Sequence, residues 1–249
     1  MVSIYQFSFG YSYAKSVGTA LGWKKSLDKC ITKLPVICER FCSVKYVDPV
    51  SKTTVILYST YLPTSGQDDE FLESLTLLNI DLSNHITDAE NPAVVIGADT
   101  NVSSKSTRRR YTEMQKFLNT YSLKTISTDL EPTFHHNNQS SESQIDHIFF
   151  SVPEDSKLRL ALKCHLCLKQ NSSNLSSHNV LVGEMVLPAT NEDTTSDDFS
   201  STYTSFVVKK PNWNASEKDD YEIETAKVLQ ELLNNYKNVE FIHLFCELL

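Results

Sequence analysis

Four short polar segments stand at the ends of apolar runs, and they carry side chains that can exchange protons with a substrate or hold a metal ion. They are Ser59-Thr60-Tyr61-Leu62-Pro63, Gly97-Ala98-Asp99-Thr100-Asn101, Ser143-Gln144-Ile145-Asp146-His147-Ile148 and Ser176-Ser177-His178-Asn179. In a layered α/β protein, polar groups at strand ends tend to meet at one edge of the sheet, where ligands bind. The sequence therefore predicts one site built from all four segments.

Each of these side chains also has an ordinary structural explanation when it is considered alone. Asp99 and Asn101 are residue types that form turns and cap helices by bonding to nearby backbone groups. His178 lies in a serine-rich segment typical of solvated loops, and Tyr61 at a strand end is typical of packing. Asp146 stands within an apolar run, where a carboxylate is costly unless it is paired or lies at an edge. Taken singly, the residues leave both interpretations open.

The elements that must position these segments follow from the periodicity of the apolar residues. Phe41 to Tyr46 and Thr53 to Tyr61 are rich in β-branched and aromatic residues and flank the turn signal Asp48-Pro49, so they predict an antiparallel hairpin. A helix is predicted next, because apolar residues recur in steps of three and four at Phe71, Leu75, Leu78, Leu82 and Ile86.

Further strands and one more helix complete the pattern. Ala93 to Gly97 is a short continuous apolar run, which predicts a strand buried on both faces. A second amphipathic stretch spans Tyr111 to Leu118, and Ile145 to Phe150 and Val180 to Leu187 are predicted as strands. Strands that alternate with a few helices and are joined partly by hairpins indicate an α/β sandwich of mixed sheets.

The remainder of the chain is predicted to be a linker and a helical segment. Residues 190–208 are polar, acidic and aperiodic, which indicates a disordered linker. Residues 209–249 contain a capping box at Ser216-Glu217-Lys218-Asp219 followed by apolar residues at helical spacing, so we expect a helical segment there. The domain proper is then expected within residues 1–189.

Charge and cysteine usage bear on partners and compartment. The formal net charge is −8, which opposes phosphate binding, but residues 191–222 hold eight acidic and three basic side chains and so carry −5 of it. The chain has no apolar run of transmembrane length and no signal-peptide pattern, so we expect an intracellular protein without a membrane span, nuclear or cytoplasmic.

The six cysteines lack the short, even spacing of a disulfide-stapled module, which indicates reduced thiols. Cys164-His165-Leu166-Cys167 offers zinc two thiolates and an imidazole, whereas a structural zinc site needs about four ligands. A strand of small apolar residues is the alternative for this segment.

Together, the segments resemble the endonuclease/exonuclease/phosphatase family, and within it the endonuclease domains of non-LTR retrotransposons. Five motifs occur in the family's order over roughly residues 10–187: Tyr61-Leu62-Pro63, Asp99-Thr100-Asn101, Pro132-Thr133-Phe134, Ile145-Asp146-His147-Ile148 and Ser176-Ser177-His178. Lys209 to Leu233 also looks like the segment that joins endonuclease to reverse transcriptase. The resemblance implies a DNase I-like two-sheet α/β sandwich and the magnesium-dependent hydrolysis of DNA phosphodiesters.

The resemblance also implies roles for individual residues. Asp99 and Asn101 would hold Mg²⁺ and position or deprotonate the attacking water. His178, oriented by Asp146, would contact the scissile phosphate, and Tyr61 would donate a hydrogen bond near the leaving oxygen. Three further residues are expected at the substrate: Thr64, Thr133 and Phe134.

The chain departs from the family pattern at several positions. Its first recognisable family segment, Val17 to Leu27, lies downstream of the family's Asn strand and of the Glu that is its main metal ligand. We therefore expect these N-terminal strands to be missing, Mg²⁺ occupancy to be reduced, and Met1 to Tyr13, with its period-two alternation, to serve as a substitute strand. Ser177 stands where the family has Asp, Thr64 where many members have Asn, and Ala98 follows Gly97 where Asp is usual.

Three functions remain open from the sequence. The leading one is a retrotransposon-derived endonuclease-like domain. The second is a catalytically inactive remnant that binds nucleic acid or protein, with Lys105 and Arg108 to Arg110 as a phosphate-contacting run or a solvated loop. The third is a phosphatase acting on small phosphoesters or lipids, because one fold supports many activities.

Overall fold

The protein was analysed as a computed structural model, which describes residues 5–10, 19–86, 91–103, 109–125, 132–135, 142–153, 164–167, 178, 180–183 and 242–245. Its centre is a six-stranded sheet in the order β3-β4-β5-β6-β10-β7. These strands are β3 (Ile31–Lys33), β4 (Phe41–Val47), β5 (Thr54–Tyr61), β6 (Ala93–Asp99), β10 (Asp146–Ser151) and β7 (Lys124–Thr125).

The connections within this sheet explain the direction of its strands. β4 and β5 form the predicted antiparallel hairpin, and β10 pairs antiparallel with both β6 and β7. β5 and β6 are parallel, because the helix α1 (Asp68–His85) carries the chain back between them. The carboxyl ends of β5 and β6 and the start of β10 therefore lie at one end of the sheet.

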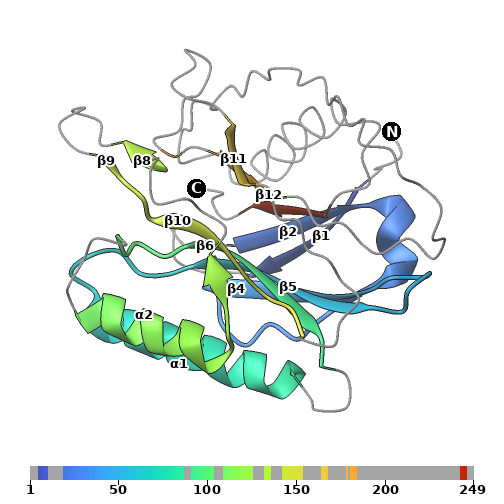
Figure 1. The fold of residues 1–249 in the computed structure, drawn as a ribbon, viewed down its shortest axis with the longest axis horizontal. Coiled ribbons are helices and arrows are strands. Elements are labelled where there is room, and N and C mark those ends of the chain that lie inside the picture. The colour runs from blue at the N-terminus through green and yellow to red at the C-terminus, as the bar shows by residue number, and fades with distance from the viewer. Residues whose placement is uncertain are drawn as a thin grey trace, which may run out of the picture.

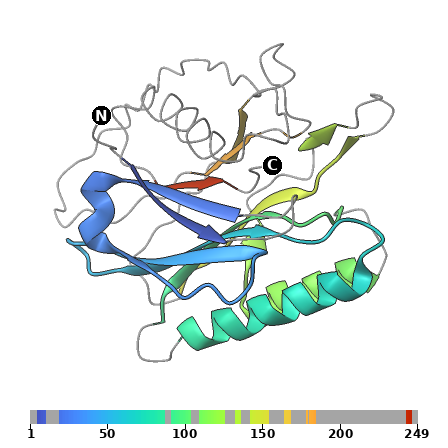
Figure 2. The ribbon, with the colours of Figure 1, turned by 180° about the vertical axis from the view of Figure 1, so that it is seen from behind.

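Two layers cover the two faces of the six-stranded sheet (Figures 1 and 2). α1 and α2 (Arg109–Thr120) lie side by side on one face. A three-stranded sheet, in the order β1-β2-β13, lies against the other. Its strands are β1 (Tyr5–Gly10), β2 (Thr19–Lys24) and β13 (Ile242–Phe245), and the short 3-10 helix η1 (Lys25–Cys30) follows β2. This is the two-sheet α/β sandwich that the sequence predicts.

The strand β6 contributes to both cores, as its continuous apolar run predicts. Val94 and Ile96 pack among the residues of α1 and α2, whereas Ala93 and Val95 pack between the sheets with residues of β2 and β10. Successive side chains point to opposite faces of a strand, so the odd-numbered positions of β6 face the three-stranded sheet. Asp99 continues this odd-numbered series.

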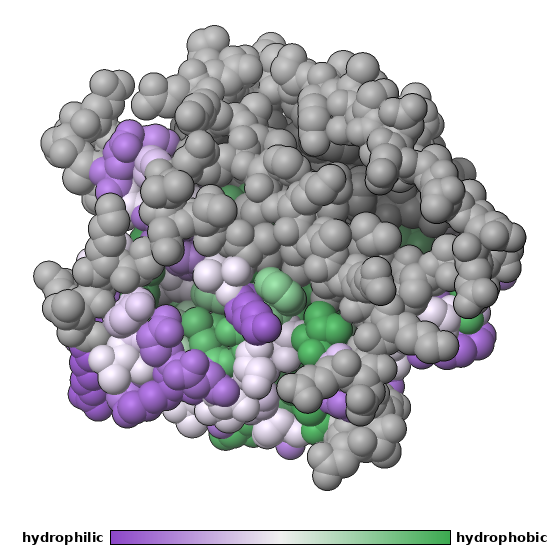
Figure 3. Space-filling view, in the orientation of Figure 1, coloured by the Kyte–Doolittle hydropathy of each residue, from purple (hydrophilic) through white to green (hydrophobic). Residues whose placement is uncertain are grey.

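The helices bury one face each and expose the other. In α1 the buried apolar residues are Phe71, Leu75, Leu78 and Leu82, the spacing that predicts it. Acidic residues at positions 68–70 occupy its first turn, where they stabilise the positive end of the helix dipole. Hydrophilic side chains gather where the helices reach the surface at the lower left of Figure 3. No helix within the described ranges is long and apolar enough to cross a membrane.

The three-stranded sheet joins residues from both ends of the chain. The predicted alternating strand near the N-terminus is confirmed over Tyr5–Gly10, where β1 pairs with one edge of β2. β13 pairs antiparallel with the other edge of β2. Residues 242–245 are therefore a strand, in contrast to the helix expected within residues 209–249. The predicted linker and the remainder of that segment lie outside the described residues.

Two small hairpins complete the described structure. β8 (Phe134–His135) pairs with β9 (Glu142–Ser143), and β11 (Cys164–Cys167) pairs with β12 (Val180–Gly183). The segment Cys164–Cys167 is thus a strand, the alternative to a zinc site in the sequence analysis. The predicted zinc ligation stays untested, because the side chains of β11 lie outside the described part of the chain.

Candidate active site

Three of the predicted site residues stand next to one another on three adjacent strands. Tyr61 of β5 is in register with Asp99 of β6, which is in register with Asp146 of β10. Each lies an even number of residues from a side chain that packs between the two sheets, so all three start from the same face. The sheet itself therefore brings together side chains that are up to 85 residues apart in the sequence.

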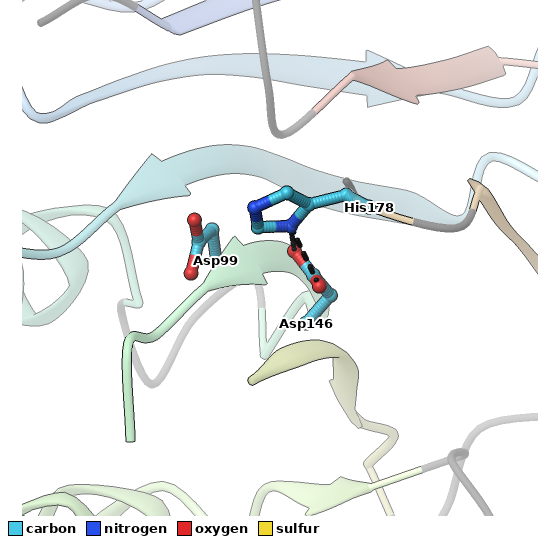
Figure 4. A group of neighbouring side chains, drawn as sticks. All are labelled: Asp99, Asp146 and His178. Carbon is cyan, nitrogen blue, oxygen red and sulfur yellow. Dashed lines mark hydrogen bonds and ion pairs between the residues drawn. The ribbon is translucent and has the colours of Figure 1, made fainter. Parts of the chain in front are cut away.

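Asp146 and His178 form a hydrogen-bonded pair beside Asp99 (Figure 4). The His178 Nδ1 atom lies 3.1 and 3.0 Å from the two carboxylate oxygens of Asp146. With Nδ1 engaged in this way, the other ring nitrogen, Nε2, lies on the side of the ring nearer Asp99. Asp146 is buried, and the His178 side chain is 12% exposed, so the pair is largely shielded from solvent.

Asp99 is held by the turn that follows its strand. One Asp99 carboxylate oxygen accepts the backbone N–H of Asn101 at 3.0 Å. Asn101 has a φ of 50°, a left-handed conformation that asparagine tolerates better than most residues. Its side-chain amide donates to the carbonyl of Leu62 at 2.8 Å, and the Leu62 N–H donates to the Asp99 carbonyl at 2.9 Å. Asn101 thus ties the Asp99 turn to the segment that follows Tyr61.

Thr133 was expected to contact substrate, but it lies in the interior of the protein. Its side chain is fully buried, and its hydroxyl oxygen accepts the backbone N–H groups of Ile145 and Asp146, both at 3.0 Å. A buried hydroxyl that satisfies two backbone donors cannot also reach a substrate in solution. Thr133 therefore positions the start of β10 and, through it, Asp146.

The two other predicted substrate contacts remain accessible. The Phe134 ring is partly exposed and meets the His178 ring edge-on, with ring centroids 4.7 Å apart. Thr64 is exposed in the turn before α1, where its hydroxyl bonds to Gln67 at 3.1 Å. Phe134 therefore flanks His178, whereas Thr64 lies at the start of the turn that leads into α1.

Arg110 also departs from expectation. The basic run predicts a solvated or phosphate-contacting residue, but Arg110 is buried. Its guanidinium lies 4.2 Å from the Phe71 ring centroid, donates to the Pro63 carbonyl and pairs with Asp68. Burial lowers the pKa of Arg110, and the nearby charge of Asp68 opposes that shift. Lys105 and Arg108 lie outside the described residues, and Arg109 is exposed.

Two residues beside the site were not among the predicted site residues. The Thr100 hydroxyl donates to the Ile145 carbonyl at 2.8 Å and so fixes the start of β10 from the side of β6. Arg40, directly before β4, places its guanidinium 5.7 Å from the Tyr61 ring centroid. The neighbouring Asp99 motif was the only signal for Thr100, and no local pattern marks Arg40.

A divalent cation fits the chemistry of this cluster. Ligand atoms of Asp99, Asp146 and His178 all lie within 4.8 Å of one another. Asp99 offers the hard oxygen that Mg²⁺ prefers, and Mg²⁺ often binds one or two carboxylates, with water and substrate phosphate completing its shell. Asp146 is already engaged with His178, so Asp99 is the primary candidate ligand.

Comparison with known proteins identifies the fold. No protein-family model and no curated protein sequence matches the chain. Among solved structures it is similar to the endonuclease domain of TRAS1, a telomere-specific non-LTR retrotransposon, with a TM-score of 0.54 and 16% identity over 73% of this chain and 78% of that one.

Two further structures show the same likeness. The AP endonuclease LMAP from Leishmania major has a TM-score of 0.58 and 13% identity over 76% of this chain and 72% of that one. An endonuclease/exonuclease/phosphatase from Bacteroides vulgatus has a TM-score of 0.54 and 17% identity over 74% of this chain and 77% of that one. The chain therefore has the DNase I-like fold of endonuclease/exonuclease/phosphatase proteins. The solved structures that share this fold with it include a non-LTR retrotransposon endonuclease domain.

Proposed function

We propose that this protein is a retrotransposon-derived, metal-dependent endonuclease-like domain that hydrolyses DNA phosphodiesters. The observation that carries the proposal is the cluster of Asp99, Asp146 and His178 at the strand ends of the sandwich. It combines a carboxylate for water or metal with an imidazole oriented by a second carboxylate. The five motifs of the sequence and the fold of the nuclease neighbours support the same function.

The proposed reaction divides its proton transfers between the two sides of the phosphate. Asp99 aligns a water molecule and accepts its proton as the oxygen attacks phosphorus. Asp146 keeps Nδ1 of His178 protonated and stabilises positive charge on the ring, so Nε2–H of His178 donates to the non-bridging phosphate oxygens. As the phosphorus–oxygen bond of the leaving group breaks, the phenol of Tyr61 donates a hydrogen bond to the departing oxygen, which takes a proton from solvent, and Asp99 releases the proton that it accepted to solvent.

Asp99 would hold Mg²⁺, with the carbonyl oxygen of the Asn101 side chain as a second candidate ligand. Once bound, Mg²⁺ would neutralise charge that develops on the phosphate. Asn101 donates its side-chain amide N–H to the Leu62 carbonyl, which fixes the side chain beside the Asp99 turn. With one carboxylate as its main protein ligand, the site is expected to bind Mg²⁺ weakly and to depend on the substrate phosphate for part of its affinity.

The direct test is the nicking of supercoiled DNA by the purified full chain across a Mg²⁺ titration. Wild-type protein should convert supercoiled to relaxed DNA, and a chelator should stop the reaction. Asp99→Ala and His178→Ala should each lower the rate by about 100- to 10,000-fold, the range for loss of a general acid or base.

His85→Ala provides a matched control for His178→Ala. His85 also pairs with a buried aspartate, Asp81, at 3.6 Å, but it lies at the end of α1 on the far face of the sheet. It should retain wild-type nicking. If wild-type protein nicks DNA no faster than Asp99→Ala, the enzyme proposal is wrong. Salt-sensitive DNA binding without nicking would instead identify the alternative, an inactive binding module.

A further inference from the structure

The positively charged side chain of Arg40 stands in line with the proposed catalytic residues. The N–H of Tyr61 donates to the Arg40 carbonyl at 2.8 Å, which places the two residues opposite each other on neighbouring strands. Cys42, two residues after Arg40, packs between the sheets, so Arg40 starts from the same face. Arg40, directly before β4, therefore continues the row that Tyr61, Asp99 and Asp146 form across β5, β6 and β10.

The surroundings of Arg40 hold its guanidinium without neutralising it strongly. Its side chain is 12% exposed and lies over the Tyr61 ring, an attraction between cation and π system. Its ion pair among the described residues is with Glu70, at 3.4 Å. Glu70 is 56% exposed, and such surface pairs contribute little because water and salt screen them. An incoming anion can therefore replace Glu70 at small cost.

We propose that Arg40 binds a phosphate of the DNA backbone that flanks the phosphate cleaved at Asp99. This inference rests on the proposed function and adds the residue that holds the substrate strand. Neighbouring strands are about 4.8 Å apart, so the backbone of Arg40 is about 10 Å from that of Asp99. That separation suits a second phosphate of the same strand better than the scissile one.

The chemistry of the guanidinium matches this role. Its planar fork of N–H donors binds two phosphate oxygens at once, which a lysine ammonium does not do. The site otherwise presents two carboxylates to a polyanion, and the whole chain has a net charge of −8. A cation beside Tyr61 offsets this repulsion where the strand must lie. Arg40 then acts in binding, and removal of its charge should raise KM more than it lowers kcat.

The test compares Arg40→Gln with Lys52→Gln in the full chain. Lys52 lies in the turn at the opposite end of the β4–β5 hairpin, so its variant removes the same charge from the same hairpin far from the site. Two readouts are taken: KM and kcat for nicking of supercoiled DNA, and the slope of log Kd against log salt for a short DNA duplex.

Arg40→Gln should raise KM and Kd by about 10- to 100-fold, the loss of a charge-assisted hydrogen bond. It should also reduce the salt slope by about 0.9, the value for one released phosphate contact. Lys52→Gln should match wild type in both. Arg40→Lys should keep the slope and recover part of the affinity. Glu70→Gln should tighten binding by about two- to fivefold, because Arg40 no longer has to leave its ion pair.

The possible negative results distinguish failure of the proposed function from failure of the role of Arg40. Wild-type protein that neither nicks nor binds DNA would contradict the proposed function, and this inference with it. Wild-type nicking together with identical KM, Kd and salt slope for Arg40→Gln and Lys52→Gln would overturn the role of Arg40 alone. A lower kcat with unchanged KM and slope in Arg40→Gln would also overturn it, since that result indicates an effect through Tyr61 rather than a phosphate contact.

Discussion

Two buried aspartate–histidine pairs lie on opposite faces of the same sheet, and their surroundings give them different capacities. Asp146, at the start of β10, pairs with His178 at 3.0 Å. Asp81 of α1 pairs with His85 at 3.6 Å and accepts a hydrogen bond from the Tyr58 phenol at 2.8 Å. The two pairs contain the same chemical groups.

The difference lies in what else surrounds each carboxylate. Tyr58 is fully buried in the core beneath α1, and this burial, together with the charge of Asp81, raises the pKa of its phenol, so it stays protonated and donates. Asp81 therefore has a buried phenol as a second partner in addition to His85. Asp146 instead lies beside Asp99, and the ring of His178 keeps one nitrogen toward it. The two pairs differ in their neighbours: a second carboxylate, Asp99, lies beside the Asp146–His178 pair, whereas a buried phenol lies beside Asp81.

The largest predicted effect concerns Asp146, the aspartate of the pair at the candidate active site. Asp146→Asn should lower nicking by about 100- to 10,000-fold, because His178 would lose its orientation and the stabilisation of its charge. The unfolding free energy should change much less, since asparagine keeps the size of the side chain. Nicking kinetics and thermal unfolding of the same preparation would measure both. Wild-type nicking by Asp146→Asn would show that the Asp146–His178 pair is not needed for the reaction.

Loss of a buried hydroxyl next to the site should affect both stability and activity. Thr133→Val would leave the N–H groups of Ile145 and Asp146 without their acceptor. We expect a loss of about 1–3 kcal/mol in unfolding free energy, with nicking reduced about tenfold through the displacement of Asp146. Thr133→Ser, which retains the acceptor, should recover most of both. Equal behaviour of the valine and serine variants would show that the hydroxyl does not position Asp146.

The Asp81–His85 pair should show the opposite pattern, with a loss of stability but no loss of activity. Tyr58→Phe removes the phenol that satisfies Asp81 and should lower the unfolding free energy by about 1–2 kcal/mol. Nicking at temperatures below the unfolding transition should stay at the wild-type level. Chemical denaturation would give the first value and the nicking assay the second. A large loss of activity without destabilisation would mean that the helix-side pair belongs to the site after all.

The smallest effect concerns a carboxylate in a turn, far from both pairs. Burial raises the pKa of Asp48, but hydrogen bonds from the side chain and backbone of Ser51 and from Tyr46 outweigh it and hold the pKa below 3.8. The ionised form therefore stabilises the fold above pH 3.8, and this contribution disappears as the pH falls through the lowered pKa. Asp48→Asn should cost about 1 kcal/mol at pH 7 and progressively less below pH 3.8. A constant difference across pH would contradict this assignment.

Most elements of the sandwich core could be predicted because their periodicities are strong and local. The hairpin, the α1 helix and the buried strand Ala93–Asp99 appear where the sequence places them, within a few residues at their ends. The pairing of β13 with β2 could not be predicted, because four residues carry no signal for a partner more than 200 positions away.

Some residues of the site could likewise be predicted from the sequence, and others could not. Asp99, Asp146 and His178 lie together: the first two because neighbouring strand ends are in register, and His178 through its bridge with Phe134. The roles of Thr133 and Arg110 did not follow from the sequence, since both depend on which backbone carbonyl or N–H group faces them in the fold. Arg40 is recognisable only once the register of the β4–β5 hairpin places it beside Tyr61.

The pairing of β13 with β2 also sets an order of assembly. The β4–β5 hairpin closes across a short turn, and β6 and β10 are separated by fewer than 50 residues, so the six-stranded sheet with Asp99 and Asp146 rests on contacts of modest sequence separation. Residues Ala20 and Phe245 can pair only after residue 245 has been synthesised, more than 200 residues after Ala20. Long-range contacts carry the larger loop-closure entropy and form late. Among the described strands, one edge of β2 is therefore the last to be paired during synthesis, and until then it is an open strand edge accessible to chaperones and to aggregation.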